Sequence, residues 1–219
     1  MPSRSEAEEH LRVIRFLMER ATLYRAITAP AAAVGGLLAL LATAILPHLG
    51  EVEINASTQA SPSSAAQFLS LWGGILGITL ATNFRFLWLE ARRRGAPFWS
   101  PGMRLALQAV LPSYLLAAVA TSFGGSVLSP ADFARFAIPI WIICHGLALL
   151  ATSHFAPRSL LLLGWGFLFA GMAAAANAYY GGFAVRFWMA ATFGLFHLIY
   201  AACAWIKRPS PAPETVVSA

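Results

Sequence analysis

The sequence predicts an all-α polytopic membrane protein with six transmembrane helices and an amphipathic cytoplasmic helix at the N-terminus. Two observations carry this fold class. Of 219 residues, 58% are hydrophobic and only 11% are charged, whereas soluble domains carry about 25% charged residues. The apolar residues also gather into six runs, each near the ~20 residues that a helix needs to cross a bilayer. This composition excludes a soluble α/β enzyme, a disordered chain and a nucleic-acid-binding domain.

The six runs predict the helices in order along the chain. Their bounds are Ile27–Pro47, Phe68–Leu89, Leu105–Leu128, Phe136–Thr152, Ser159–Tyr179 and Phe187–Ile206. Backbone groups in lipid must be satisfied within the segment, and these runs lack the alternation of barrel strands, so we expect helices. The domain organisation is then a cytoplasmic tail over 1–25, a transmembrane domain over 26–206 and a disordered, proline-containing tail over 207–219.

Basic residues indicate the orientation of the chain. Twelve of the fifteen lie in the two tails and in the connections after the second and fourth spans, all on one side. The opposite side holds only Arg135 and Arg186, and its connection over 49–66 contains acids but no base. Because basic loops stay in the cytoplasm, we expect both termini there. Arginine supplies fourteen of the fifteen bases, and the chain is rich in alanine, which favours a bacterial source and the inner membrane.

The N-terminal tail predicts an amphipathic helix. Ser5-Glu6-Ala7-Glu8 is a capping-box pattern, and Leu11, Ile14, Met18 and Ala21 follow at helical spacing on one stripe. Such a helix lies in the cytoplasmic interface of the bilayer or packs against the protein's own cytoplasmic face. Docking to a partner is a third interpretation.

Arg85 is the only clearly charged residue inside a predicted span. It stands seven residues before the Arg92–Arg94 cluster, ~10 Å at helical rise, so its side chain can reach the headgroups. The alternative is a buried cation that faces an anionic site or a polar path, since Gly74 and Ala81 lie on the same helix face and small residues mark contacts between helices.

His145 and His197 form the most suggestive pair. Each falls near the middle of its span, the fourth and the sixth, and these two spans run in the same direction. The two side chains therefore lie at similar depth and meet if the helices are neighbours. They could ligate haem, hold a metal or relay protons, or each could simply hydrogen-bond a neighbouring helix. Cys144 points about 100° away from His145 on a helix, which makes it a poor co-ligand.

Small residues predict surfaces for helix packing. Gly73 and Gly77 form a GxxxG motif that Ala81 extends, and Gly194 lies on a stripe of small residues in the sixth span. Such motifs bring helix backbones close together, within one subunit or between subunits.

The sequence lacks any recognisable catalytic constellation. No acid lies in the middle of a span, and there is no P-loop, GxSxG or HExxH motif. We therefore expect a non-enzymatic membrane subunit or interaction protein without a cofactor or metal, whose partners are the lipid bilayer and a membrane protein or further copies of the chain. A small transporter or channel that uses Arg85, and a haem-binding redox protein that uses His145 and His197, are the alternatives.

Three segments carry a resemblance to a protein family. They are Arg15–Ala21, Pro139–Ile143 followed by Gly146, and Phe193–His197. The chain resembles a family of small, uncharacterised bacterial six-span membrane proteins, over most of its length. The family pattern usually has Tyr-Gly where this chain has His145-Gly146, so only His197 matches a family histidine. The resemblance implies the six-span architecture and no particular activity.

Overall fold

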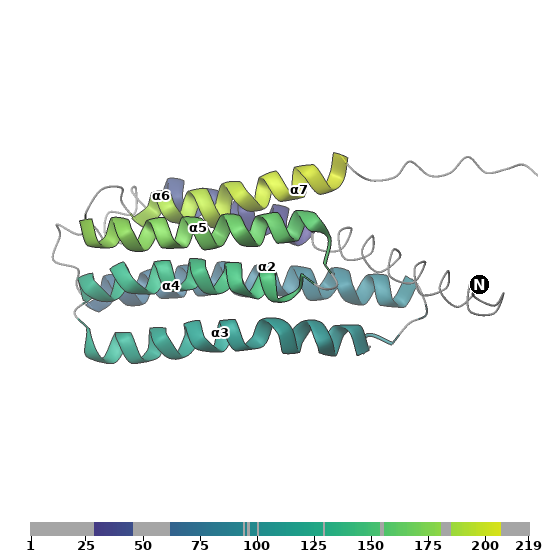
Figure 1. The fold of residues 1–219 in the computed structure, drawn as a ribbon, viewed down its shortest axis with the longest axis horizontal. Coiled ribbons are helices and arrows are strands. Elements are labelled where there is room, and N and C mark those ends of the chain that lie inside the picture. Colours follow the sequence, from purple (N-terminus) through teal and green to yellow (C-terminus); the bar gives the residue numbers. More distant parts are fainter. Residues whose placement is uncertain are drawn as a thin grey trace, which may run out of the picture.

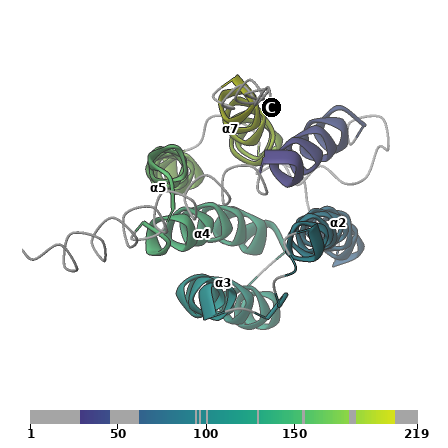
Figure 2. The same cartoon turned by 90° about the vertical axis from the view of Figure 1, so that its right-hand side faces the viewer.

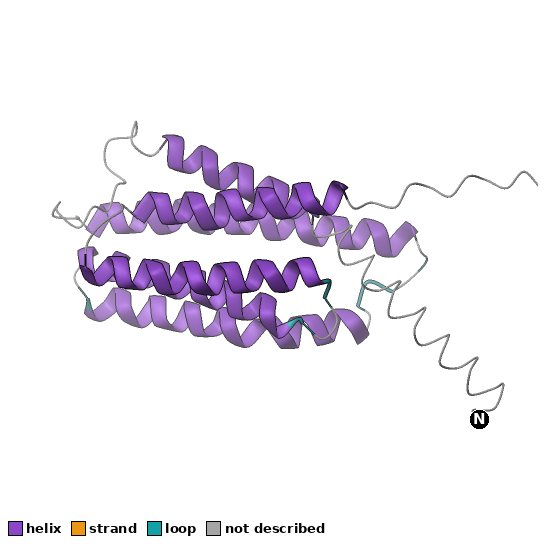
Figure 3. Cartoon of the chain, turned by 45° about the horizontal axis from the view of Figure 1, so that its top comes forward, coloured by secondary structure: helices purple, strands orange, loops and turns teal. Residues whose placement is uncertain are grey.

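A computed structural model describes the helical part of the chain. The described residues are 29–45, 62–93, 95, 97–99, 101–128, 130–153, 156–180 and 185–206. Three sequence expectations lie outside them, namely the amphipathic helix over 1–25, most of the connection over 49–66 and the C-terminal tail over 207–219. Every element in the described part is a helix, and none of its residues forms a strand (Figure 3).

Six helical rods make up the described structure, and they run roughly along one common axis (Figure 1). The first rod is Ala29–Ile45, followed by α2 (Pro62–Arg93), α3 (Pro101–Val127), α4 (Pro130–Ala151) and α5 (Arg158–Tyr180). The last rod consists of α6 (Val185–Met189), η2 (Ala190–Phe196) and α7 (His197–Ile206) without a break. Proline is the first residue of α2, α3 and α4, where its missing N–H costs nothing and its fixed φ favours the first helical turn.

Three helical segments are long and apolar enough to cross a membrane. They are Met103–Val127, Arg158–Tyr180 and Arg186–Ile206, and two shorter apolar helices cover Ala29–Ile45 and Phe136–Ala151. Large apolar side chains are exposed on the outside of the bundle, including Leu116, Phe123 and Leu162. Soluble proteins rarely expose apolar surface on this scale, so the finding indicates a membrane protein.

α2 differs from the sequence expectation at its start. The helix begins at Pro62 and not near Phe68, so residues 62–66 of the expected connection are helical. Its 32 residues span about 48 Å, more than the hydrocarbon core of a bilayer. The segment between Pro62 and Phe68 holds Ser and Ala residues, which carry too little apolar character to mark a span but are compatible with a helix.

α4 occupies the centre of the bundle. Figure 2 shows it between α3 and α5, with α2 and the C-terminal rod also around it. Its contact with α5 is the most extensive in the described structure. A Cβ placed on Gly146 would lie 2.8 Å from the carbonyl oxygen of Gly164, and a Cβ on Gly171 would lie 2.9 Å from the backbone nitrogen of Ile143. The two backbones therefore touch, which only glycine allows at these positions.

The Ala29–Ile45 helix also packs closely beside the C-terminal rod, again at glycines. A Cβ on Gly36 would lie 2.9 Å from the carbonyl oxygen of Gly194, and a Cβ on Gly194 would lie 2.6 Å from the side chain of Leu40. Ala32 joins a second buried cluster with Tyr200 and Ala201 of α7. The predicted packing residue Gly194 thus lies at a close contact between helices.

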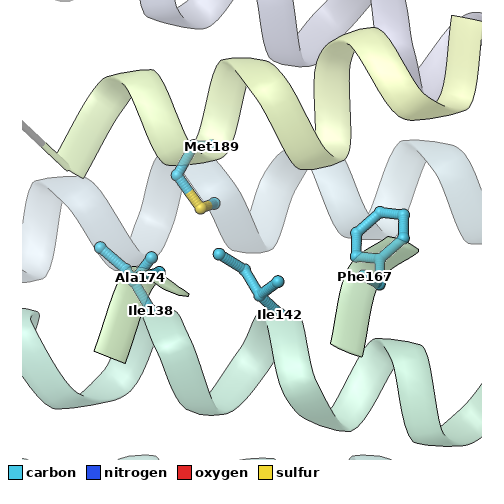
Figure 4. Close-up of a cluster of buried hydrophobic side chains, with 5 residues drawn as sticks. All are labelled: Ile138, Ile142, Phe167, Ala174 and Met189. Atoms are coloured by element: carbon cyan, nitrogen blue, oxygen red, sulfur yellow. The ribbon is translucent and has the colours of Figure 1, made fainter. Parts of the chain in front are cut away.

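A buried apolar cluster connects α4, α5 and the C-terminal rod. It consists of Ile138, Ile142, Phe167, Ala174 and Met189, drawn in Figure 4. The Ile142 and Phe167 side chains are 0% exposed. This cluster fixes the distance between the helices that carry the histidines, because Ile142 is one turn before His145 and Met189 is two turns before His197.

The C-terminal rod contains a π-helical segment that the sequence did not predict. Residues Ala190–Phe196 form i→i+5 hydrogen bonds, which widen the turn. The fully buried Thr192 lies within it, and its hydroxyl donates a hydrogen bond to the Trp188 carbonyl at 2.7 Å. The hydroxyl is thereby satisfied without a partner on another helix. Segments of this kind frequently occur at functional sites.

Candidate functional site

The two histidines of the fourth and sixth predicted spans lie side by side. His145 comes from the middle of α4, and His197 is the first residue of α7, directly after the π-helical segment. Their ring centroids are 5.2 Å apart. The packing of the buried apolar cluster brings together these two side chains, which are 52 positions apart in the sequence.

A tyrosine of α3 completes a polar cluster with them. The Tyr114 hydroxyl lies 2.8 Å from Nδ1 of His145, within hydrogen-bonding distance. One helical turn along α4, the Trp141 indole N–H donates to the Thr121 hydroxyl at 2.8 Å, and Thr121 in turn donates to the Ala117 carbonyl. The Tyr114 contact therefore orients the His145 ring, and the bond between Trp141 and Thr121 is a second polar contact between α3 and α4.

Hydrogen bonding determines where the His197 ring carries its hydrogen. Nδ1 of His197 lies 3.1 Å from the Phe193 carbonyl oxygen. A carbonyl oxygen only accepts, so Nδ1 is the donor, and in a neutral imidazole Nε2 then holds a lone pair. Nε2 of His145 is also buried and has no hydrogen-bond partner within the described structure. The cluster thus offers two imidazole nitrogens that internal contacts do not use.

Two phenylalanine rings enclose the histidines. The Phe167 centroid lies 4.5 Å from that of His145 and 5.3 Å from that of His197. Phe193 lies 5.3 Å from His145 and stacks on His197 with an interplanar angle of 15°. These contacts exclude water from one side of the imidazoles and hold both rings in place.

A cavity of about 190 Å³ lies beside the histidine pair. Residues of every described helix except α5 line it, among them Gly35, Thr79, Tyr114, Trp141, His145 and His197. No Asp, Glu, Lys or Arg side chain contributes to this lining. The site therefore combines a mostly apolar lining with a few polar groups, as small-molecule sites usually do.

A metal site would need further ligands, or a wider spacing of the two rings, than His145 and His197 provide in their observed positions. Within the described ranges, no group of three His, Cys, Asp or Glu side chains could hold a metal ion. Two axial imidazoles on a haem iron would place their ring centroids roughly 6 Å apart, given metal–nitrogen bonds of about 2 Å. The observed 5.2 Å would have to increase, against the contacts that Phe167 makes with both rings.

The other sequence-predicted residues lie away from the cluster. Arg85 is exposed on α2 and does not contribute to the cavity lining. Gly77 and Ala81 are exposed on the same helix, whereas Gly73 lines the cavity. The GxxxG motif of Gly73 and Gly77 makes no tight contact with any described residue.

Sequence reasoning did not find Tyr114, Phe167 or Phe193. Tyr114 is a polar aromatic residue in the middle of an apolar run, and that is the signal by which it could have been selected. The two phenylalanines give no such signal, because the chain contains fifteen and most would suit any lipid-facing position.

Comparison with known protein families, curated proteins and solved structures finds no significant match for this chain. The class of protein therefore follows from the fold and the site alone. It is an all-helical bundle with membrane-spanning character and a histidine-lined cavity near its centre.

Proposed function

We propose that the chain is a six-span protein of the bacterial inner membrane with both termini in the cytoplasm, and that it acts as a non-enzymatic subunit through helix packing. The apolar helices and the distribution of twelve basic residues on one side support the architecture. The surface through which it acts is the glycine face of α2, formed by Gly73, Gly74 and Gly77.

The contrast between this face and the other glycines carries the proposal. An added Cβ would meet another atom at 3.0 Å or less at Gly35, Gly36, Gly146, Gly164, Gly171 and Gly194. At the three glycines of the α2 glycine face, an added Cβ would meet no described atom within 4 Å. The chain thus uses glycine where two helices touch, and on α2 it presents the same feature without a neighbour among the described residues.

The occupant we propose is the α2 helix of a second copy. Self-association through a GxxxG face needs only one surface, which both subunits present to each other around a two-fold axis. α2 also makes few contacts with the described helices α3 to α7, and many of its apolar side chains, including Leu76, Ile78 and Leu80, are exposed and thus available to a partner. Small residues let the two backbones approach, and van der Waals packing then holds them.

The mass of the purified protein tests this proposal. Gly77→Ile places a branched side chain on the α2 glycine face, and we expect it to convert a dimer in mild detergent into a monomer. Ala173→Ile is the matched control, because Ala173 is exposed on α5 and away from this face. Light scattering coupled to size exclusion measures the mass of each variant.

Cross-linking gives a second readout. Gly77→Cys in a Cys203→Ser background should form a disulfide-linked dimer in native membranes, whereas Ala173→Cys in the same background should not. The proposal fails if the wild type is a monomer in membranes and in mild detergent. If a different protein copurifies and Gly77→Ile releases it, self-association is wrong and the surface serves another subunit.

A further inference from the structure

The central cavity has the size of a site for one aromatic ring. Its volume of about 190 Å³ exceeds the ~150 Å³ of an engineered apolar cavity that takes up benzene. Flat side chains form much of its wall, namely those of Trp72, Tyr114, Trp141 and Phe193. A planar ring can pack against such walls with offset or edge-to-face contacts.

Both imidazoles belong to the lining of the cavity, which is otherwise mostly apolar. His197 presents an Nε2 lone pair, since its Nδ1 hydrogen is bound to the Phe193 carbonyl. Nε2 of His145 is buried without a partner, although burial of an unsatisfied polar atom costs about 1–3 kcal/mol. A cavity that binds only apolar ligands would not need either Nε2 atom in its lining.

We propose that the cavity binds a small, uncharged aromatic alcohol, a single-ring phenol or quinol, whose hydroxyl bridges His145 and His197. Because no charged side chain is among the described residues of the lining, a ligand with a net charge would find no counter-ion there, and we expect an uncharged ligand. The ring centroids of the two histidines are 5.2 Å apart, close enough for one hydroxyl oxygen to reach both.

A hydroxyl fits this pair better than a carbonyl does. The hydroxyl donates to the lone pair on Nε2 of His197, which a carbonyl cannot do. When Tyr114 donates to Nδ1 of His145, Nε2 of His145 carries a hydrogen and the ligand oxygen accepts it. When the Tyr114 bond runs in the other direction, both Nε2 atoms carry lone pairs and the single hydroxyl hydrogen reaches only one of them. The bridging hydroxyl therefore selects the tautomer of His145 in which Tyr114 is the donor.

Fluorine NMR on the full chain in lipid nanodiscs tests the proposal with two probes of nearly equal size. 4-Fluorophenol carries the hydroxyl, and fluorobenzene lacks it. We expect saturable binding of 4-fluorophenol about tenfold tighter than that of fluorobenzene, because only the phenol satisfies the two imidazole nitrogens. Empty nanodiscs measure the partition of each probe into lipid.

Substitutions assign the binding to this cavity. His145→Leu and His197→Leu should lower the affinity for 4-fluorophenol to that for fluorobenzene. Ala137→Phe fills the cavity and should abolish the binding of both probes, whereas Ala151→Phe, at an exposed position of the same helix, should not. Circular dichroism and elution volume check that each variant folds, and His145→Gln, which keeps a polar group, should retain part of the preference.

Two results would overturn the proposal. If neither probe binds above the level of empty nanodiscs, the cavity is not a ligand site. If both probes bind equally and His145→Leu has no effect, the cavity is an apolar void without polar recognition. The mass of the protein is independent of these readouts, so this test and the test of the α2 glycine face succeed or fail separately.

Discussion

The backbone contact of Gly146 with α5 allows a quantitative prediction for Gly146→Ala. The new Cβ would lie 2.8 Å from the Gly164 carbonyl oxygen and 2.8 Å from the Leu168 nitrogen. Both are backbone atoms, so no side-chain rotation relieves the overlap. An ordinary van der Waals contact needs at least 3.4 Å, and the two helices must therefore separate by about 0.6 Å at this point.

The free energy of unfolding should fall as a consequence. A gap of 0.5–1 Å forfeits about a quarter to a half of the dispersion attraction between the atoms concerned. Overpacking of this kind costs about 1–3 kcal/mol. Replacement of a helical glycine by alanine also gains about 1 kcal/mol in helix propensity, which has to be subtracted.

Gly166→Ala provides the reference that removes the propensity gain. Gly166 also lies in a helix, but an added Cβ there makes only an ordinary contact, 3.5 Å from the Phe196 ring. The difference in unfolding free energy between Gly146→Ala and Gly166→Ala should therefore equal the packing cost, about 1–3 kcal/mol. Reversible unfolding in SDS, followed by tryptophan fluorescence and circular dichroism, measures it. Equal transition midpoints for the two variants would refute the reasoning.

Two further predictions concern the polar groups. Trp141→Phe removes the indole donor to Thr121 and should lower the unfolding free energy by about 0.6 kcal/mol, a typical value for hydrogen bonds between membrane helices, in the same SDS titration. The loss should stay small because Thr121 keeps its bond to the Ala117 carbonyl; a loss of several kcal/mol would contradict this account. Arg85→Ala should change the unfolding free energy by less than about 0.5 kcal/mol and leave 4-fluorophenol binding intact, since Arg85 is exposed and outside the cavity. Loss of probe binding in this variant would instead connect Arg85 to the cavity.

The histidine pair shows how much of the candidate site could be predicted from the sequence. Hydropathy alone located His145 and His197 near the middle of two apolar runs and at similar depth. It could not determine that the rings touch, because that depends on the lateral order of the helices. Part of that order depends on close backbone contacts between α4 and α5 at Gly146, Gly164 and Gly171, and none of these three was predicted as a packing residue.

The GxxxG motif of α2 shows the opposite limitation, because the sequence predicted a packing surface there and could not identify the helix that it contacts. Gly73 and Gly77 attracted attention because their spacing matches a known motif, yet they make no tight contact within the described structure. A motif of small residues identifies a helix that can be approached closely, but not the helix that approaches it. Tyr114 was missed for a related reason, since its role depends on the position of His145 on the next helix.

The π-helical segment has a consequence for how this chain can change in length. In a regular α-helix every fourth residue drifts by about 40° around the axis, and the wider turn of η2 reduces that drift. Met189, Phe193 and His197, spaced by four, can thus all line one cavity. Deletion of one residue from Ala190–Phe196 would restore a regular helix at little cost to the backbone, because the wider turn holds one extra residue within nearly the same rotation. Such a loss would leave α7 in nearly the same orientation relative to α6, whereas a deletion in a regular helix rotates the residues after it by about 100°. The π-helical segment is therefore the place where the rod can lose a residue and still keep His197 beside His145.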